Sequence, residues 1–112
     1  MEISESREGN VVVLAVDGRL DAGTAPAFEE KVLGLIDAGN RRVVVDGAKL
    51  AYVSSAGLRV FLMAAKRLGP PNGHFAVGAL QAPVREVFDI AGFSSVLSIH
   101  DSRTAAIASA AG

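Results

Sequence analysis

The sequence contains no cysteine, and it has no excess of charge of either sign. Without cysteine the chain cannot form a disulfide framework, a thiolate metal site or a thiol nucleophile, and this composition fits a reducing compartment such as the cytoplasm. Eleven basic and twelve acidic residues give a formal net charge of -1, with no block of like charges. We therefore expect neither nucleic acid nor an anionic membrane surface as a partner.

Long hydrophobic runs are also missing. Residues 1–10 are acidic and polar, and no apolar run approaches the roughly eighteen residues that a membrane span needs. We expect no targeting segment and no membrane insertion. Half of the 112 residues are nonetheless hydrophobic and a fifth are charged, which is typical of a chain that folds on its own. The length predicts a single domain over 1–112.

Apolar strand patterns alternate with helical patterns along the chain. Strands are predicted around Ile3 and at 11–16, 43–45, 74–80 and 96–100, and helices at 25–38, 56–68, 82–92 and 101–111. In the second helix the predicted apolar stripe is Leu58, Phe61, Leu62 and Ala65. This alternation predicts an α/β fold with a mixed sheet of about five strands and about four α-helices, beginning with an antiparallel hairpin.

The segment YVSSAGL places two hydroxyls where a strand pattern gives way to a helix. Ser54 and Ser55 fall between the strand near Val45 and the helix beginning about Ala56. Serine is favoured at a helix start because its oxygen accepts a hydrogen bond from a free backbone N–H, which explains one of the two serines. The second hydroxyl, followed by small Ala56 and Gly57, indicates an uncovered turn that a partner could approach closely. Free N–H groups and the helix dipole would also favour a phosphate there.

Three segments of the chain resemble the STAS family, in its bacterial anti-sigma factor antagonist branch. They are YVSSAGLRVFL at 52–62, VDGRLDAGTAPAFEE at 16–30 and GALQAPVREVFDIAGFSSVLSIHDS at 78–102. The resemblance implies a single-domain STAS-like fold and a cytoplasmic switch protein. It further implies that an anti-sigma factor with serine kinase activity phosphorylates a serine at the start of the second helix. A PP2C-type phosphatase would reverse the reaction, and the unmodified form would bind the anti-sigma factor and release a sigma factor.

By position, Ser55 matches the phosphoacceptor of the family, and Ser54 is the second choice. Ser54 stands where the best-known antagonists carry an aspartate. Ala56 matches the next small residue, and Gly57 and Leu58 match the G-L pair. Asp21 matches the aspartate of the family's G-x-L-D turn.

The predicted partner surface extends from residues 54–58 to Asp21 and Thr24, because the ends of neighbouring strands lie at one edge of a sheet. Asp21 and Thr24 could instead simply cap the first helix. Arg59 should point away from the buried stripe, toward a partner or into water. Asp46 ends a strand and is expected to fix a turn.

Other functional classes have weaker support in the sequence. A hydrolase elbow would need a glycine two residues before the serine, and only His74 and His100 could serve as bases. The two histidines are far apart and show no metal-ligand spacing, so we expect no enzyme activity, no metal and no cofactor. A non-phosphorylated STAS subunit of a transporter, or of another signalling complex, remains an alternative to the switch.

Overall fold

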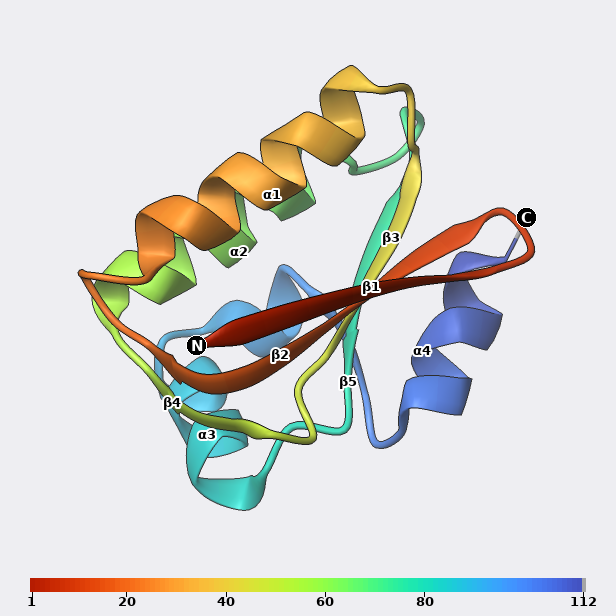
Figure 1. Ribbon diagram of the computed structural model, residues 1–112. Helices are drawn as coiled ribbons and strands as arrows, with labels where there is room; N and C mark the ends of the chain where they lie inside the picture. Colours follow the sequence, from red (N-terminus) through yellow and green to blue (C-terminus); the bar gives the residue numbers. More distant parts are fainter. Residues whose placement is uncertain (112) are drawn as a thin grey trace.

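The computed structural model describes residues 1–111, and its centre is a mixed sheet (Figure 1). Strands β1 (Glu2–Glu8) and β2 (Val11–Leu20) form the expected antiparallel hairpin. Strands β3 (Arg42–Asp46), β5 (His74–Gly78) and β6 (Ser98–His100) follow in parallel, so that the order is β1-β2-β3-β5-β6. The predicted α/β fold with a mixed sheet is confirmed.

One strand was not predicted. Strand β4 (Leu50–Val53) pairs in parallel with the last residues of β2, beyond the stretch of β2 that pairs with β3. The register of this pairing shifts between Gly18 and Arg19, where an irregularity interrupts the ladder. The segment KLAYV at 49–53, between the predicted strand at 43–45 and the predicted helix at 56–68, therefore contains a strand. It brings the end of β2 beside the segment that leads into the second helix.

Helices cover both faces of the sheet (Figure 1). Helices α1 (Ala25–Asp37) and α2 (Ser55–Arg67) lie side by side on one face, and α4 (Arg103–Ala110) lies on the other. Helix α3 (Ala82–Ile90) contacts β4 and is followed by the 3₁₀ turn Phe93–Ser95. The predicted four helices are all present. Alternate side chains of β2 supply the two cores: Val12 and Leu14 point to the α1/α2 face, and Val11 and Val13 to the α4 face.

Phe61 of α2 lies at the centre of the larger core. Its ring centroid is 5.2 Å from that of Phe28, 6.2 Å from that of Phe75 and 5.0 Å from that of Phe88. These tilted and edge-to-face arrangements are the favoured geometries for aromatic pairs. The helix is rotated relative to the expected stripe, since its buried residues are Gly57, Val60, Phe61 and Ala64. Leu58, Leu62 and Ala65 are only half-buried, because α2 packs against both the sheet and α1.

The smaller core lies between α4 and the sheet and consists of valines and alanines: Val11, Val13, Val44, Ala76, Ala106 and Ala110. The helix approaches the sheet closely at Gly78, where an added Cβ would lie 2.6 Å from the Ser102 carbonyl oxygen. Arg103 pairs with Asp46 at 3.2 Å, and Arg42 donates to the Ala110 carbonyl at 2.7 Å. Asp46 also accepts from the Ala48 N–H at 2.9 Å, which confirms its expected role in fixing a turn.

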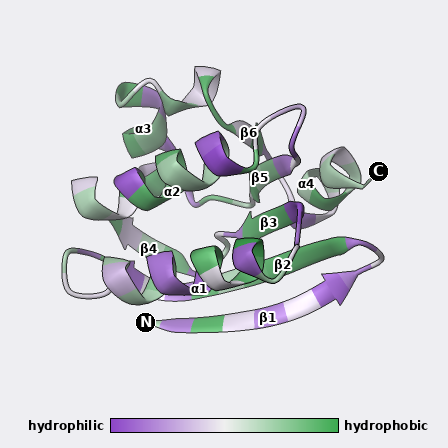
Figure 2. Cartoon of the chain, turned by 90° about the horizontal axis from the view of Figure 1, so that it is seen from above, coloured by the Kyte–Doolittle hydropathy of each residue, from purple (hydrophilic) through white to green (hydrophobic). Residues whose placement is uncertain are grey.

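Strand β1 forms an edge of the sheet. Figure 2 shows it mostly in purple and white, whereas β2 and β3 are largely green. Charged side chains on an edge strand discourage pairing with other chains, and Glu5 of β1 forms an ion pair with Lys31 of α1 at 2.6 Å. Within residues 1–111, no helix is both long enough and apolar enough to cross a bilayer.

Candidate functional site

Ser54 is held by two hydrogen bonds at the junction between β4 and α2. Its N–H donates to the Leu20 carbonyl at 2.8 Å, and its Oγ accepts from the Gly57 N–H at 3.3 Å. The second bond is that of an N-cap, which satisfies one of the free donors of the first helical turn. The prediction that one serine caps the helix is confirmed, and that serine is Ser54.

Ser55 is the first residue of α2, so the helix begins one residue earlier than expected. Its side chain is exposed. The hydrogen bonds found within residues 1–111 include none from its hydroxyl, in contrast to that of Ser54. The two adjacent serines therefore differ: one hydroxyl is used by the fold and the other is presented to solvent.

The loop from Asp21 to Thr24 is stabilised by hydrogen bonds between its own side chains and its backbone. Asp21 Oδ1 accepts from the N–H groups of Gly23 at 3.0 Å and Thr24 at 3.1 Å. Thr24 Oγ1 in turn accepts from the Asp21 N–H at 2.9 Å and donates to the Arg19 carbonyl at 2.8 Å. The hydrogen bond from the Thr24 N–H, followed by that from Gly23, holds the pKa of Asp21 below its usual range.

The expectation that these two side chains cap α1 is wrong. Thr24 occupies the N-cap position, but its side chain makes no capping hydrogen bond with the helix, because the hydroxyl is already used within the loop. Asp21 binds the N–H groups of the loop residues Gly23 and Thr24, not those of the helix. Both side chains fix the loop shape. The carboxylate of Asp21 remains half-exposed and charged at neutral pH.

The structure brings the Asp21 loop and the serine turn together, as the sequence predicted. Leu20 and Val53 are register partners in the β2–β4 ladder, so that Asp21 and Ser54 each follow directly on adjacent strands. The hydrogen bond between the Ser54 N–H and the Leu20 carbonyl closes this junction. The neighbour of β2 here is the unpredicted strand β4, whereas β3 pairs with an earlier stretch of β2.

Gly57 does not contribute an open surface. It is buried, and an added Cβ would lie 2.8 Å from Leu20 Cγ and 2.9 Å from Val53 Cγ2. Real Cβ atoms essentially never come so close to a carbon. The expectation that Gly57 allows a partner to approach is therefore wrong: the glycine lets α2 approach the β2–β4 pair. Ala56 and Leu58 are likewise half-buried against the larger core.

An exposed pair of side chains beside the turn was missed in the sequence. The Arg19 guanidinium lies 4.2 Å from the centroid of the Tyr52 ring, within the range of a cation–π interaction. The two residues are register partners in the β2–β4 ladder, one step before the turn. Tyr52 is the only tyrosine and 40% of it is exposed. No local sequence pattern indicates this pair, because the two residues are far apart in the sequence and meet only through the pairing of β2 with the unpredicted strand β4.

Arg59 is exposed on α2, which confirms its predicted direction. It lines a shallow open groove of about 360 Å³ together with Leu62, Met63, Lys66 and Arg67. All three charged side chains of this groove are basic, and α2 contains no acidic residue. The groove therefore presents three basic side chains beside the apolar Leu62 and Met63.

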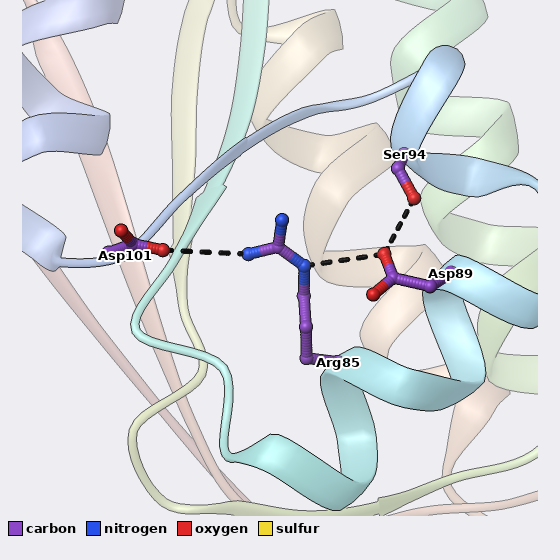
Figure 3. A network of polar contacts seen from close by, with 4 residues as sticks. All are labelled: Arg85, Asp89, Ser94 and Asp101. Atoms are coloured by element: carbon purple, nitrogen blue, oxygen red, sulfur yellow. Dashed lines mark hydrogen bonds and ion pairs between the residues drawn. The ribbon is translucent and has the colours of Figure 1, made fainter.

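Helix α3, which contacts β4, is fastened by a polar network (Figure 3). Arg85 pairs with Asp89 at 3.4 Å and with Asp101 at 3.8 Å, and the Ser94 hydroxyl donates to Asp89 at 2.6 Å. The Ser94 hydrogen bond is the main reason that the pKa of Asp89 lies below its usual range. The network links α3 to the turn that follows it and to the segment after β6.

The two histidines are used elsewhere. His74 contacts the Ser109 hydroxyl at 3.2 Å, and His100 contacts that of Ser98 at 2.8 Å. Burial lowers the pKa of His74, with Arg42 and His100 adding to the effect. In the part of the chain that the structure describes, neither histidine is hydrogen-bonded to Ser54 or Ser55. Over the same residues, no three His, Cys, Asp or Glu side chains gather into a possible metal site.

Comparison with known proteins identifies the family of the chain. The family model described as "Mlab, STAS domain" matches residues 3–98. The chain therefore belongs to the STAS domain family, and its relatives place it in the branch of the anti-sigma factor antagonists. A Bordetella bronchiseptica protein named "Putative anti-sigma factor antagonist BtrV" is 37% identical over 108 residues, which cover 96% of this chain and 93% of that protein.

Solved structures show the same fold. An anti-sigma factor antagonist from Mycobacterium paratuberculosis superposes with a TM-score of 0.89 at 22% identity, over 97% of this chain and 92% of that one. The Bacillus cell fate determinant SpoIIAA in its phosphorylated form gives a TM-score of 0.73 at 18% identity, over 95% of this chain and 96% of that one.

Proposed function

We propose that this protein is a phosphorylation-switched anti-sigma factor antagonist with Ser55 as its phosphoacceptor. The observation that carries the proposal is that the two serine hydroxyls have different environments. Ser54 Oγ is used as the N-cap, whereas the Ser55 hydroxyl is exposed and free at the start of α2. Family membership suggests the class of partner, because two similar proteins are named as antagonists of anti-sigma factors.

In the unmodified state, the surface formed by Ser54, Ser55 and the Asp21–Thr24 loop binds an anti-sigma factor that is also a serine kinase, and the sigma factor is released. The kinase transfers the terminal phosphoryl group of ATP: the Ser55 Oγ–P bond forms, the bond from phosphorus to the ADP oxygen breaks, and the hydroxyl proton is released. A PP2C-type phosphatase delivers water to the phosphorus. This step restores the hydroxyl and releases inorganic phosphate.

Charge explains how the modification would end binding. A phosphoserine carries about -1.5 to -2 at pH 7. A negative group at the start of a helix is compatible with the fold, so phosphorylation need not unfold α2. The partner would have to desolvate the phosphate in the middle of the contact surface, near the charged Asp21 loop, and this is costly unless the partner itself supplies a cationic group.

The test combines mass mapping with binding. The protein is incubated with ATP and the co-encoded anti-sigma kinase, and we expect one phosphate on Ser55. Ser55→Ala should remain unmodified and still bind the kinase, whereas Ser54→Ala should still be phosphorylated. Phosphate on Ser54 would contradict the assignment. If the wild type stays unmodified, the protein would instead be a constitutive STAS subunit of another complex.

A further inference from the structure

Ser55 and Arg59 are four residues apart on α2, and both side chains are exposed. Residues with this spacing lie on the same helical face, with about 5 to 6 Å between their Cβ atoms. An acidic group four residues before a basic one is the favourable order of such a pair. The ion pairs found within residues 1–111 do not involve Arg59. Its guanidinium is therefore available to a new anion on Ser55.

The other charged groups near the turn are already engaged. The Asp21 carboxylate accepts two backbone N–H groups of its own loop, and Arg19 is stacked on Tyr52. Lys66 and Arg67 lie further along α2, about 16 to 18 Å from Ser55 at the rise of an α-helix. Arg59 is therefore the cation best placed to reach a group carried by Ser55.

We propose that Arg59 is the built-in counterion of a phosphate on Ser55, and that phosphorylation withdraws this arginine from the docking surface. The inference rests on the proposed function of Ser55. A phosphate offers three acceptor oxygens, and the planar guanidinium can donate two parallel hydrogen bonds to them. The modification then acts twice: it adds negative charge at the turn, and it neutralises the end of the basic groove nearest to the turn.

This second effect concerns a surface that the unmodified protein presents to its partner. The groove of Arg59, Leu62, Met63, Lys66 and Arg67 has three cations beside two apolar side chains, so it suits a partner segment that carries both acidic and apolar side chains. In the unmodified protein Arg59 is free to pair with an acidic side chain of the partner. In the phosphorylated protein it is already paired, and the groove has lost one of its three positive charges.

The experiment measures the phosphate directly and needs no partner. Phosphoserine is incorporated at position 55 of the full chain during translation, and the second ionisation of the phosphate is followed by ³¹P NMR. We expect its pKa in the wild type to be lower by about 0.15 to 0.4 unit than in Arg59→Gln. The matched control Arg67→Gln removes the same charge from the same helix three turns away, and it should leave the phosphate pKa unchanged. The Nε–Hε signal of Arg59, assigned by its loss in Arg59→Gln, should shift as the phosphate titrates.

Two results would overturn the proposal. One is a phosphate pKa in Arg59→Gln within about 0.1 unit of the wild-type value. The other is an equal rise in Arg67→Gln, or a larger rise in Arg19→Gln, which would assign the effect to overall charge or to a different arginine. Because the phosphoserine is installed without a kinase, these results are independent of whether a kinase modifies Ser55. Failure of the counterion and failure of the proposed switch can thus be told apart.

Discussion

Gly57→Ala tests whether close internal packing at the start of α2 holds the site together. The added methyl group would lie 2.8 Å from Leu20 Cγ and 2.9 Å from Val53 Cγ2. Leu20 is fully buried and Val53 is 4% exposed, so neither side chain can move into solvent to relieve the overlap. These two residues are also the register partners that join β2 to β4 just before the functional loops.

The size of the effect follows from two opposing terms. Forcing extra atoms into a well-packed region costs about 1 to 3 kcal/mol. Replacing a helical glycine by alanine raises the unfolding free energy by about 0.5 to 1 kcal/mol, because the unfolded chain has less backbone entropy. We expect a net loss of about 1 to 2 kcal/mol, which lowers the melting temperature of a domain of this size by roughly 5 to 10 °C.

Gly34→Ala is the matched control. Gly34 lies inside α1 and is exposed, and an added Cβ there would meet no atom within 4 Å. The same substitution should therefore raise the melting temperature, by about 2 to 5 °C, because only the entropy term acts. Thermal unfolding followed by circular dichroism compares the two variants with the wild type. If Gly57→Ala were as stable as Gly34→Ala, Leu20 and Val53 would be free to rearrange, and our account of Gly57 would be wrong.

Three further predictions concern the site residues themselves. Ser54→Ala should lose about 1 kcal/mol of unfolding free energy through loss of the N-cap, whereas Ser55→Ala should stay within about 0.5 kcal/mol of the wild type in urea denaturation. Ser55→Asp should melt within about 3 °C of the wild type yet bind the anti-sigma factor at least tenfold more weakly, about 1.4 kcal/mol, and unchanged affinity in titration calorimetry would contradict the proposed surface. The lowered pKa of Asp21 means that its charged form adds stability above the usual carboxyl range, and that this stability is lost as the pH falls through the lowered pKa. Urea unfolding should therefore show the wild type to be more stable than Asp21→Asn near neutral pH, with the difference shrinking as the pH falls through the lowered pKa of Asp21.

The main elements of the fold could be predicted because their patterns are local. The valine runs of β2 and β3 and the apolar spacing of α1 identify buried strands and a helix without knowledge of their neighbours. Strand β4 could not be predicted in this way. It has only four residues, its two exposed residues are adjacent, and it is defined by a parallel ladder to the end of β2, some thirty residues earlier in the chain.

The same distinction applies to the site. The N-cap serine and the role of Asp46 follow from turn chemistry, which acts over two or three residues. The inward direction of Gly57 and the Arg19–Tyr52 pair depend on how β2, β4 and α2 meet in space. The alternative in which Asp21 and Thr24 cap α1 failed for a related reason, because both side chains have several possible backbone partners within hydrogen-bonding reach.

The unequal sizes of the two cores determine which part of the molecule can open most easily. The α4 face is held by a few valines and alanines, whereas the face of α1 and α2 contains the aromatic cluster around Phe61. Less apolar surface is buried under α4, so its local detachment costs less free energy than opening the other face. We therefore expect α4 to show faster hydrogen exchange than α1 and α2. The serine turn begins α2, on the opposite face of the sheet from α4, so we expect its geometry to persist while α4 opens and recloses.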